Sequence, residues 1–207
     1  MAELDDYIAS PPTVATKCDI VHCGQVGLVW NEKDVETLKT KYRMVGSHIS
    51  NVTEQAMSNN GCSLPWILSA EEVTLLLQID AIQLVSGFEE EDALIEGDSE
   101  DFSWNYPTTP LETMRFRLFE DLWRRGYYLT PGIKFGGEFL VYLGDPQTHH
   151  SRFITTLLES AEQTINPVQL VALSRLGTGV TKSRLLSVYS SLTQSFEYIT
   201  VNWSSLS

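Results

Sequence analysis

Three kinds of side chain in the second half of the sequence can transfer protons or stabilise negative charge. His149 and His150 follow a Gly-Asp-Pro turn, in a loop position of the kind where functional groups often collect. Histidine titrates near neutral pH, so an imidazole there can accept or donate a proton. Tyr142 ends the preceding apolar run, and Lys182 follows a Gly-Thr-Gly turn. Each residue also has an ordinary structural interpretation: a solvated loop histidine, an aromatic packed at a sheet end and a surface lysine.

The segments that must hold these residues alternate between helix and strand. Thr109, Pro110 and Glu112 supply an N-cap, a first-turn proline and a capping-box acid, and predict a helix that runs to Arg125 before Gly126. Strands are predicted at 127–130, 134–142, 183–189 and 196–203, and a second helix from Asn166 and Pro167 to about Gly177, with Gly136 and Gly137 marking a bend or a close backbone approach. The second half is therefore predicted to be α/β.

The first half predicts a smaller α+β domain at residues 18–87. Its patterns are a hairpin at 19–23 and 28–30, a helix capped by Asn31 with Val35, Leu38 and Tyr42 inward, a second helix with a Ser69–Glu72 capping box, and a strand at 81–85. Residues 1–17 are predicted to be a flexible amino terminus, residues 88–108 an acidic linker, and residues 109–207 the second domain.

The charge of the chain is unevenly distributed. The net charge is −13, yet up to Pro110 there are 19 acidic against 5 basic side chains, and from Leu111 onward 8 against 9. Eight acids and no base lie between Glu89 and Asp101. Such a run is typically solvated, which favours a linker over a docking loop. The second half is nearly neutral, so it can approach a polyanion such as RNA, although the charge is too low for broad RNA affinity.

Composition excludes several other classes of protein. Hydrophobic residues at 43% and charged residues at 20% are typical of a globular chain. No apolar run approaches the roughly 18 residues of a membrane helix, and the acidic start does not resemble a signal peptide. Three cysteines, at positions 18, 23 and 62, form neither a disulfide framework nor a zinc motif. We therefore expect a reducing compartment and no metal.

Several short motifs in the second half occur in a specific order. They read RRGYYLTPGIKFGGEFLVYLGDP at 124–146, HHS at 149–151 and RLGT at 175–178. Over residues 115–207 these blocks strongly resemble the catalytic domain of the tRNA-splicing endonuclease family. The first half is similar more loosely, through its hairpin, its LVW run and its SAEEVTLLL helix. Among eukaryotic subunits the sequence looks most like the one that cleaves the 3′ splice site of intron-containing pre-tRNA.

This resemblance implies a fold and a catalytic triad. The fold is a restriction-endonuclease-like α/β catalytic domain with a mixed central sheet at 109–207. The triad is Tyr142, His150 and Lys182. His150 is preferred to His149 because the family motif places its imidazole directly before a stretch like Ser151 to Ile154, whereas the chemistry of two imidazoles leaves the choice open.

The reaction that the resemblance implies needs neither metal nor cofactor. The RNA 2′-hydroxyl attacks the adjacent phosphorus, leaving a 2′,3′-cyclic phosphate and a 5′-hydroxyl. Tyr142 takes the 2′ proton, His150 protonates the leaving oxygen, and Lys182 stabilises the charge on phosphorus. A free tyrosine, with a pKa of about 10, is a poor base at pH 7, and a neighbouring lysine cation favours its phenolate.

The resemblance also implies binding sites for RNA and for other subunits. Arg175 and Trp203 match an arginine and a late aromatic that sandwich a flipped bulge nucleotide at the other catalytic subunit's cleavage site. Their ordinary roles would be to complement a helix C-terminus and to close a sheet. The implied partners are intron-containing pre-tRNA and other endonuclease subunits in a heterotetramer. In it, the C-terminal strand pairs with a small structural subunit, and an acidic loop docks in a basic pocket that Arg152, Arg184 and Lys134 would line.

Two other hypotheses stay open from the sequence. One is a non-catalytic structural paralogue that scaffolds the same assembly, although such a chain would be expected to have lost part of the triad. The other is an unrelated α/β binding domain, which applies if the motif resemblance is set aside. A nuclear location is implied by the family alone, because no dense cluster of lysine and arginine forms a nuclear signal.

Overall fold

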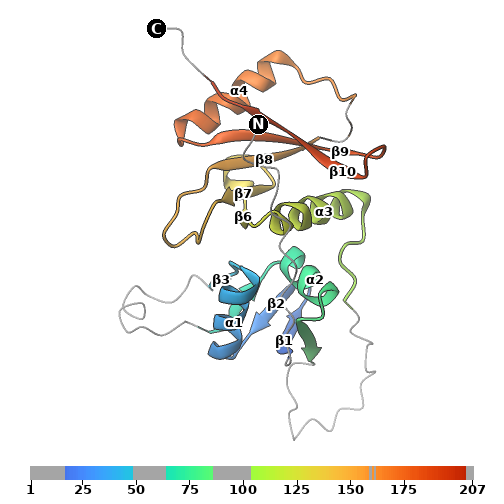
Figure 1. Ribbon diagram of the computed structural model, residues 1–207, viewed down its shortest axis with the longest axis vertical. Coiled ribbons are helices and arrows are strands. Elements are labelled where there is room, and N and C mark those ends of the chain that lie inside the picture. The colour runs from blue at the N-terminus through green and yellow to red at the C-terminus, as the bar shows by residue number, and fades with distance from the viewer. Residues whose placement is uncertain (1–16, 49–63, 86–103, 159, 161, 204–207) are drawn as a thin grey trace, which may run out of the picture. The chain divides into compact units, whose positions relative to one another are not determined.

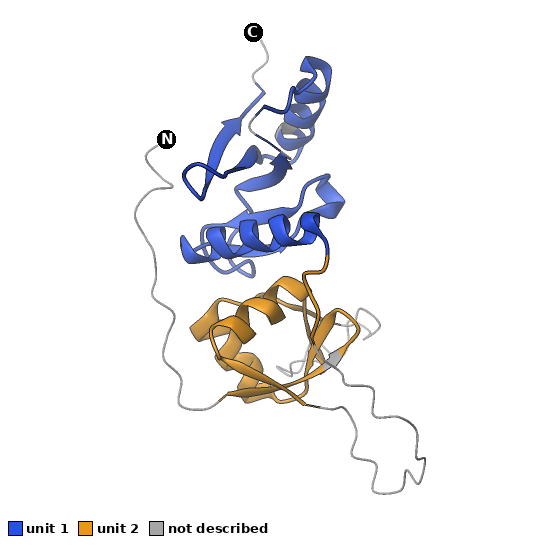
Figure 2. Ribbon diagram, turned by 90° about the vertical axis from the view of Figure 1, so that its right-hand side faces the viewer, with its two compact units in different colours: residues 1–10, 109–207 blue, residues 11–108 orange. Residues whose placement is uncertain are grey.

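The computed structural model describes residues 17–48, 64–85, 104–158, 160 and 162–203. The chain divides into two compact units, coloured separately in Figure 2: an amino-terminal unit at residues 11–108 and a carboxy-terminal unit that contains residues 109–207. The boundary falls at Thr109, the N-cap of a helix. None of the described helices is long and apolar enough to cross a membrane.

The amino-terminal unit is a five-stranded sheet with two helices. Its elements are β1 (Cys18–Cys23), β2 (Val26–Val29), α1 (Glu32–Tyr42), β3 (Ser47–His48), β4 (Trp66–Leu68), α2 (Ala70–Gln78) and β5 (Ile82–Val85). All of them except β4 and β5 are labelled in Figure 1. The strand order is β3-β4-β2-β1-β5, and only the β1–β5 pair is parallel. The predicted hairpin, both helices and the last strand are confirmed. The short strands β3 and β4 were not predicted.

Both helices of this unit cover the same face of the sheet. Lys39 of α1 lies over the ring of Trp66 in β4, with its ammonium 5.0 Å from the ring centroid. A Cβ atom at Gly27 of β2 would lie 2.7 Å from Val73 of α2, so a glycine is required at that point. Because Gly27 and Trp66 belong to the same alternating set of buried strand residues, α1 and α2 pack on one side. The core of the unit therefore lies between this sheet face and the two helices.

Glu72 is a fully buried carboxylate that connects three segments of the amino-terminal unit. One carboxylate oxygen accepts hydrogen bonds from the backbone N–H groups of Val45 and Gly46, each at 2.9 Å, and the other accepts one from Ser69, also at 2.9 Å. Burial raises the pKa of Glu72, while these hydrogen bonds act in the opposite direction. The predicted capping box is thus confirmed, and its glutamate also ties the chain after α1 to the start of α2.

The end of the predicted linker packs on α2. Trp104 donates its indole N–H to the hydroxyl of Thr74, and that hydroxyl donates to the carbonyl of Tyr106. The phenol of Tyr106 in turn donates to the buried carboxylate of Glu71. Residues 104–108, which the sequence analysis assigned to a linker, are therefore a docked segment of the amino-terminal unit. The acidic run itself lies outside the described residues.

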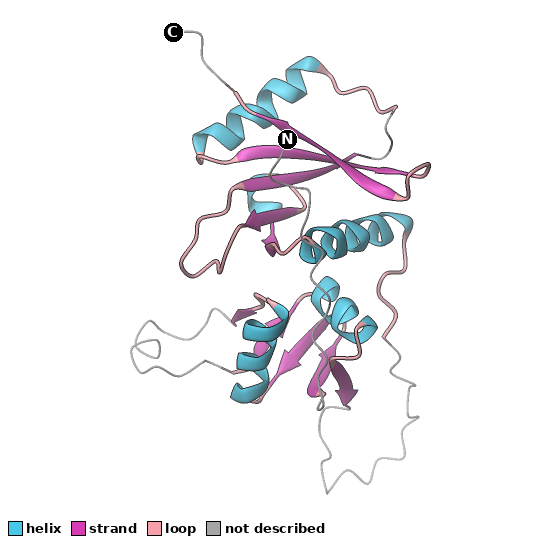
Figure 3. Cartoon of the chain, in the orientation of Figure 1, coloured by secondary structure: helices cyan, strands magenta, loops and turns pink. Residues whose placement is uncertain are grey.

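The carboxy-terminal unit is a second five-stranded sheet with a helix on each side. Its elements are α3 (Pro110–Arg124), β6 (Tyr128–Pro131), the 3₁₀ turn η1 (Ile133–Phe135), β7 (Phe139–Tyr142), β8 (Phe153–Leu158), α4 (Pro167–Gly179), β9 (Ser183–Ser190) and β10 (Ser195–Val201). The strand order is β10-β9-β8-β7-β6, with β8 and β9 parallel and the other pairs antiparallel. The predicted α/β unit with a mixed sheet is confirmed, and Figure 3 shows its helices in cyan and its strands in magenta.

The two faces of this sheet carry different helices. Phe119 of α3 packs edge-on against Phe139 of β7, with ring centroids 5.5 Å apart, and Tyr198 of β10 donates a hydrogen bond to Asp121 of α3. Alternate residues of a strand point to opposite faces, so Tyr142 of β7 points away from α3. The helix α4 lies on that opposite side of the sheet (Figure 1). Tyr142 therefore lies on the α4 side.

Two features of the carboxy-terminal unit differ from the sequence prediction. The predicted strand at 134–142 is wrong in its first half, because only Phe139–Tyr142 pair as a strand and Ile133–Phe135 form a turn of 3₁₀ helix. Gly136 ends that turn with φ 65°, and a Cβ at Gly137 would lie 2.4 Å from the carbonyl oxygen of Thr155, so a bend and a close backbone approach both occur. The strand β8 was not predicted, although its run FITTLL is rich in β-branched residues.

We predict that Glu72→Ala destabilises the amino-terminal unit by about 3 kcal/mol or more, because three part-buried backbone N–H groups lose the carboxylate that accepts from them. Urea unfolding of the full chain, followed by circular dichroism, measures the loss. The matched control is Glu36→Ala on the exposed side of α1, which is expected to change the unfolding free energy by less than about 0.5 kcal/mol. Equal losses in the two variants would contradict this role for Glu72.

Candidate functional site

Two of the predicted residues meet at one edge of the carboxy-terminal sheet. Val141 of β7 pairs with Phe153 of β8, and Phe153 pairs with Ser183 of β9. The row extends by one residue, since the N–H of Arg152 donates to the carbonyl of Val141 at 2.8 Å and the N–H of Ser183 donates to that of Arg152 at 3.0 Å. Tyr142, next to Val141, is the last residue of β7, and Lys182, next to Ser183, directly precedes β9. Only β8 lies between these two strands. Two strand spacings place their backbones about 10 Å apart.

Tyr142 and Lys182 also share a face. Leu140 pairs with Ile154, and Ile154 pairs with Arg184, so these three residues lie on one face. Tyr142 and Lys182 are each two residues away from a member of this set, on the same strand side. The phenol oxygen of the half-buried Tyr142 accepts a long hydrogen bond, 3.4 Å, from the hydroxyl of Thr130 in β6.

The two histidines differ in their surroundings. The His149 ring folds back on its own turn: its Nδ1 lies 2.9 Å from the hydroxyl of Thr148 and 3.3 Å from the carbonyl oxygen of Asp145. The same ring lies against Gly144, where a Cβ would come within 2.7 Å of it. His150 is exposed and forms no hydrogen bond or ion pair with a described residue. Only His150 presents a ring without a competing partner among the described residues.

Lys182 is held at the junction between α4 and β9. Its backbone N–H donates to the carbonyl of Gly177 at 2.9 Å, and a Cβ at Gly177 would lie 2.6 Å from the carbonyl oxygen of Lys182. The glycine of the RLGT motif is thus required where the helix turns back against the strand. The half-buried ammonium donates to the carbonyl of Val180 at 3.3 Å and lies 5.6 Å from the ring centroid of Phe135. Phe135 was not among the residues predicted for this site.

Arg175 and Trp203 lie in contact with each other. The guanidinium carbon of Arg175, which is exposed on α4, is 4.5 Å from the ring centroid of Trp203, just beyond β10. This is the geometry of a cation–π pair. The two residues that the sequence analysis paired across 28 positions of the chain are therefore neighbours in space.

The predicted basic pocket does not form as expected. Arg184 is fully buried, so it cannot line a surface pocket, and that part of the prediction is wrong. The side chains of Lys134 and Arg152 are exposed. Among the described residues, no group of three or more His, Cys, Asp and Glu side chains could hold a metal ion.

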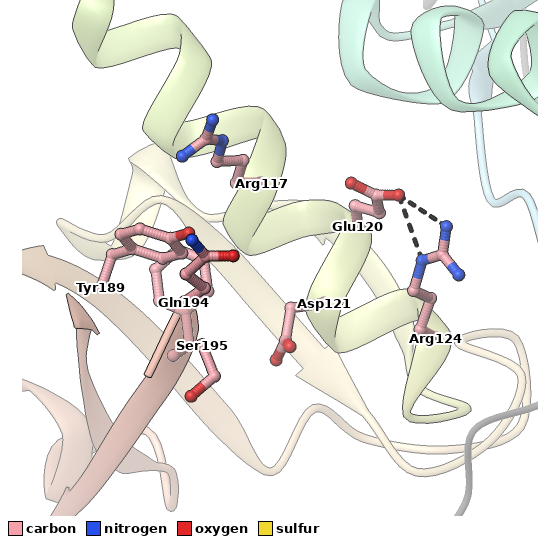
Figure 4. Close-up of a pocket in the computed structure, with 8 residues that line it drawn as sticks. Arg117, Glu120, Asp121, Arg124, Tyr189, Gln194 and Ser195 are labelled. Carbon is pink, nitrogen blue, oxygen red and sulfur yellow. Dashed lines mark hydrogen bonds and ion pairs between the residues drawn. The ribbon is translucent and has the colours of Figure 1, made fainter. Parts of the chain in front are cut away.

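A pocket of about 240 Å³ lies on the other face of the sheet, between α3 and the β9–β10 hairpin (Figure 4). Its acids are already paired, because Glu120 binds Arg124 and Asp121 binds Arg125 and the phenol of Tyr198. Burial, and then the neighbouring Asp121, raise the pKa of Tyr198 far above its ordinary value. None of the predicted site residues lines this pocket, so it is not a candidate for the acid–base chemistry.

Comparison with known proteins identifies the family. Residues 113–198 match the model of the tRNA intron endonuclease catalytic C-terminal domain, and residues 18–87 match the model of the TSEN34-like N-terminal domain. The chain belongs to the tRNA-splicing endonuclease family. The first match begins within α3 and ends within β10, so it contains Tyr142, His150, Arg175 and Lys182.

Individual relatives of this family match parts of the chain. A human protein named tRNA-splicing endonuclease subunit Sen34 is 43% identical over 83 residues, which are 40% of this chain and 26% of the relative. A Schizosaccharomyces pombe protein named probable tRNA-splicing endonuclease subunit sen34 is 27% identical over 156 residues, 75% of this chain and 48% of the relative. A Sulfolobus acidocaldarius tRNA-splicing endonuclease is 24% identical over 140 residues, which are 67% of this chain and 74% of the relative. The matches thus span a quarter to a half of the two eukaryotic relatives.

Proposed function

We propose that this chain is a catalytic subunit of a tRNA-splicing endonuclease and cleaves pre-tRNA at the 3′ splice site. The reaction is attack of the RNA 2′-hydroxyl on the adjacent phosphorus without a metal, giving 2′,3′-cyclic phosphate and 5′-hydroxyl ends, so the enzyme is a tRNA-intron lyase. The observation that carries the proposal is the strand register that brings Tyr142 and Lys182 to one face of one sheet edge, beside the loop of His150. We also propose that the carboxy-terminal unit has a restriction-endonuclease-like fold.

The three side chains supply the three requirements of this reaction. Tyr142 takes the proton from the 2′-hydroxyl, His150 donates a proton to the leaving 5′ oxygen, and the Lys182 ammonium stabilises the negative charge that develops on the phosphoryl oxygens. Support comes from their environments: Tyr142 and Lys182 share a face, and His150 is exposed without a competing hydrogen bond from a described residue. The contacts of the His149 ring within its own turn favour His150 over His149 as the acid.

Arg175 and Trp203 form the proposed binding site for an unpaired nucleotide of the RNA. A guanidinium and an indole can hold a base between them, each stack contributing about 1 to 3 kcal/mol. The distance of 4.5 Å between the guanidinium carbon and the indole centroid supports this role, because the two groups are already neighbours. A base must separate them in order to enter. We infer that the site serves the cleavage site of another catalytic subunit, as the family resemblance implies.

The proposed assembly is a heterotetramer of endonuclease subunits. The relatives are named as subunits, which implies further chains. In this chain β10 is an outer strand of its sheet, and its Ile199 is 57% exposed. An outer strand offers unpaired backbone groups to another chain, so we propose that β10 pairs with a small structural subunit. A nuclear location is part of the same proposal and rests on the resemblance.

A non-catalytic scaffold in the same assembly is the alternative function. It is favoured only by the outer strand, which a structural subunit would need equally. It predicts that the assembly requires the chain but that cleavage at the 3′ splice site does not require Tyr142, His150 or Lys182. Substitution of those side chains in an intact assembly separates the two functions.

We predict that His150→Ala slows cleavage at the 3′ splice site by about 10²- to 10⁴-fold, the usual contribution of a general acid. The chain is reconstituted with its co-purifying partners, an intron-containing pre-tRNA is cut, and the new termini are analysed for 2′,3′-cyclic phosphate. His149→Ala is the matched control and is expected to cut the 3′ site at the wild-type rate. The 5′ cut is expected to be unchanged in both variants. If His150→Ala and wild type cut the 3′ site equally, the catalytic proposal fails.

A second prediction concerns the Arg175–Trp203 pair. Trp203→Ala is expected to reduce the cut made by the other catalytic subunit about 5-fold or more, because one stacking contact is lost, while Trp203→Phe keeps most of the rate. The measurement is cleavage of the same pre-tRNA by the reconstituted assembly, scored separately at the two splice sites. A loss confined to the 3′ cut, or no loss at either site, would show that the pair does not hold a base for the partner's site.

A third prediction concerns the outer strand. Ile199→Asp places a charge on the exposed part of β10 and is expected to reduce recovery of the partner subunits by about tenfold or more. Leu192→Asp, at the 96% exposed tip of the same hairpin, is the matched control and is expected to leave recovery unchanged. Quantitative co-purification measures both. Equal recovery with Ile199→Asp and wild type would mean that assembly does not use this strand.

A further inference from the structure

Arg184 is a buried arginine without an acidic partner. Its side chain is fully buried, and within the described residues it forms no ion pair with a carboxylate. One terminal nitrogen donates to the carbonyl of Gly136 at 3.0 Å and to the hydroxyl of Thr156 at 3.4 Å, and the other donates to the carbonyl of Phe135 at 3.2 Å. Its Nε is buried and has no hydrogen-bond partner in the part of the chain that the structure describes. Burial lowers the pKa of the guanidinium.

Burial of such a cation costs free energy, so the groups that bind it indicate which segment it stabilises. Moving a cation out of water carries a large cost unless it is paired or well hydrogen-bonded. The main acceptors here are two consecutive carbonyls, that of Phe135 at the end of η1 and that of Gly136 directly after it, which apolar side chains could not satisfy. The planar guanidinium can reach both carbonyls at once. Arg184 therefore binds the 133–137 turn, which contains the KFGG motif, to the sheet.

The turn bound by Arg184 lies on the face that carries Tyr142 and Lys182. Arg184 pairs with Ile154, and a Cβ at Gly137 would lie 2.5 Å from Ile154 and 3.1 Å from the Arg184 guanidinium. The turn is thus packed directly against this face of β8 and β9. Lys182 lies two residues before Arg184 on the same strand side, one step nearer to the sheet edge.

The same turn supplies one of the two contacts that the Lys182 ammonium makes with described residues. Phe135, whose carbonyl accepts from Arg184, presents its ring 5.6 Å from Nζ of Lys182, within the range of a cation–π contact. The other contact is the carbonyl of Val180, which lies in the loop just before Lys182. If the turn moved away from the sheet, the ammonium would keep only its local carbonyl.

We propose that Arg184 is a positioning residue for the reaction: it anchors the 133–137 turn so that the Phe135 ring holds the Lys182 ammonium in place. The inference rests on the proposed function, in which Lys182 stabilises charge on the phosphoryl group. Arg184 itself does not touch the RNA, because it is fully buried. Its effect is on the rate of the 3′ cut and not on RNA affinity.

The first test replaces Arg184 in the reconstituted endonuclease. Arg184→Met keeps the length of the side chain but removes its charge and donors, and is expected to lower kcat for the 3′ cut by about 10- to 100-fold with an unchanged KM, as for a misplaced catalytic group. The 5′ cut of the same assembly is the internal control and is unchanged. Arg184→Lys restores part of the rate, since an ammonium can reach a carbonyl but lacks the planar fork. Arg124→Met removes an exposed arginine from α3 and keeps the wild-type rate.

The second test replaces the ring that Arg184 is inferred to hold. Phe135→Leu keeps an apolar side chain but removes the π face, and is expected to lower the same kcat by about tenfold. If both residues act through one arrangement, the double variant Arg184→Met with Phe135→Leu is no slower than the slower single variant. The single variant Phe135→Leu also tests the inference if Arg184→Met does not assemble, because Phe135 is only half-buried.

Each result bears on the inference. Unchanged 3′ cleavage with Phe135→Leu overturns it, as do losses that multiply in the double variant, a loss that appears only in KM, or equal losses at both splice sites. Lys182→Met separates this failure from failure of the proposed function. If Lys182→Met abolishes the 3′ cut while the Phe135 and Arg184 variants do not, only the positioning role is wrong. If Lys182→Met leaves the 3′ cut intact, the catalytic proposal fails as well.

Discussion

The hydrogen-bonded row through β7, β8 and β9 is the constraint on which the candidate site depends. The N–H groups of Arg152 and Ser183 each bind the carbonyl of the neighbouring segment, so the ends of three strands are aligned at one edge of the sheet. Side-chain direction in a sheet has a period of two, so a slip of one residue at either pairing would send Tyr142 or Lys182 to the face covered by α3. The proposed chemistry therefore depends on backbone pairing in the interior of the unit as much as on the exposed groups.

Glycines make this arrangement possible at points where the chain passes close to the strands. Gly177 lies against the carbonyl of Lys182, and Gly137 against the carbonyl of Thr155, at distances that a Cβ atom would not tolerate. Both belong to motifs by which the sequence resembles the endonuclease family, RLGT and KFGG. The motifs thus have a packing explanation that is independent of the resemblance: Gly177 lets the end of α4, and Gly137 lets a turn, approach the strands that carry the candidate catalytic residues.

The two units stabilise buried polar groups by the same physical means. Glu72 in the amino-terminal unit and Arg184 in the carboxy-terminal unit are both buried charges without an ionic partner among the described residues, and both are solvated by backbone groups. In each case the charged side chain connects a turn to a regular element: the chain after α1 to α2, and the turn after β6 to β9. Such contacts hold irregular segments that apolar packing alone would leave without hydrogen-bond partners.

Local signals in the sequence determined most of the elements, because they act over a few residues. The capping boxes at Ser69 and Thr109, the Asn31 cap and the β-hairpin were predicted because a cap or a tight turn needs only neighbouring side chains and backbone. The first half of the strand predicted at 134–142 was wrong, because its apolar pattern does not reveal a distant arginine that binds the carbonyls of this segment. The contact of Phe135 with Lys182 and the burial of Arg184 were likewise decided only by tertiary structure. They depend on which strands pair and in which register, and such contacts join residues up to 49 positions apart that no local pattern connects.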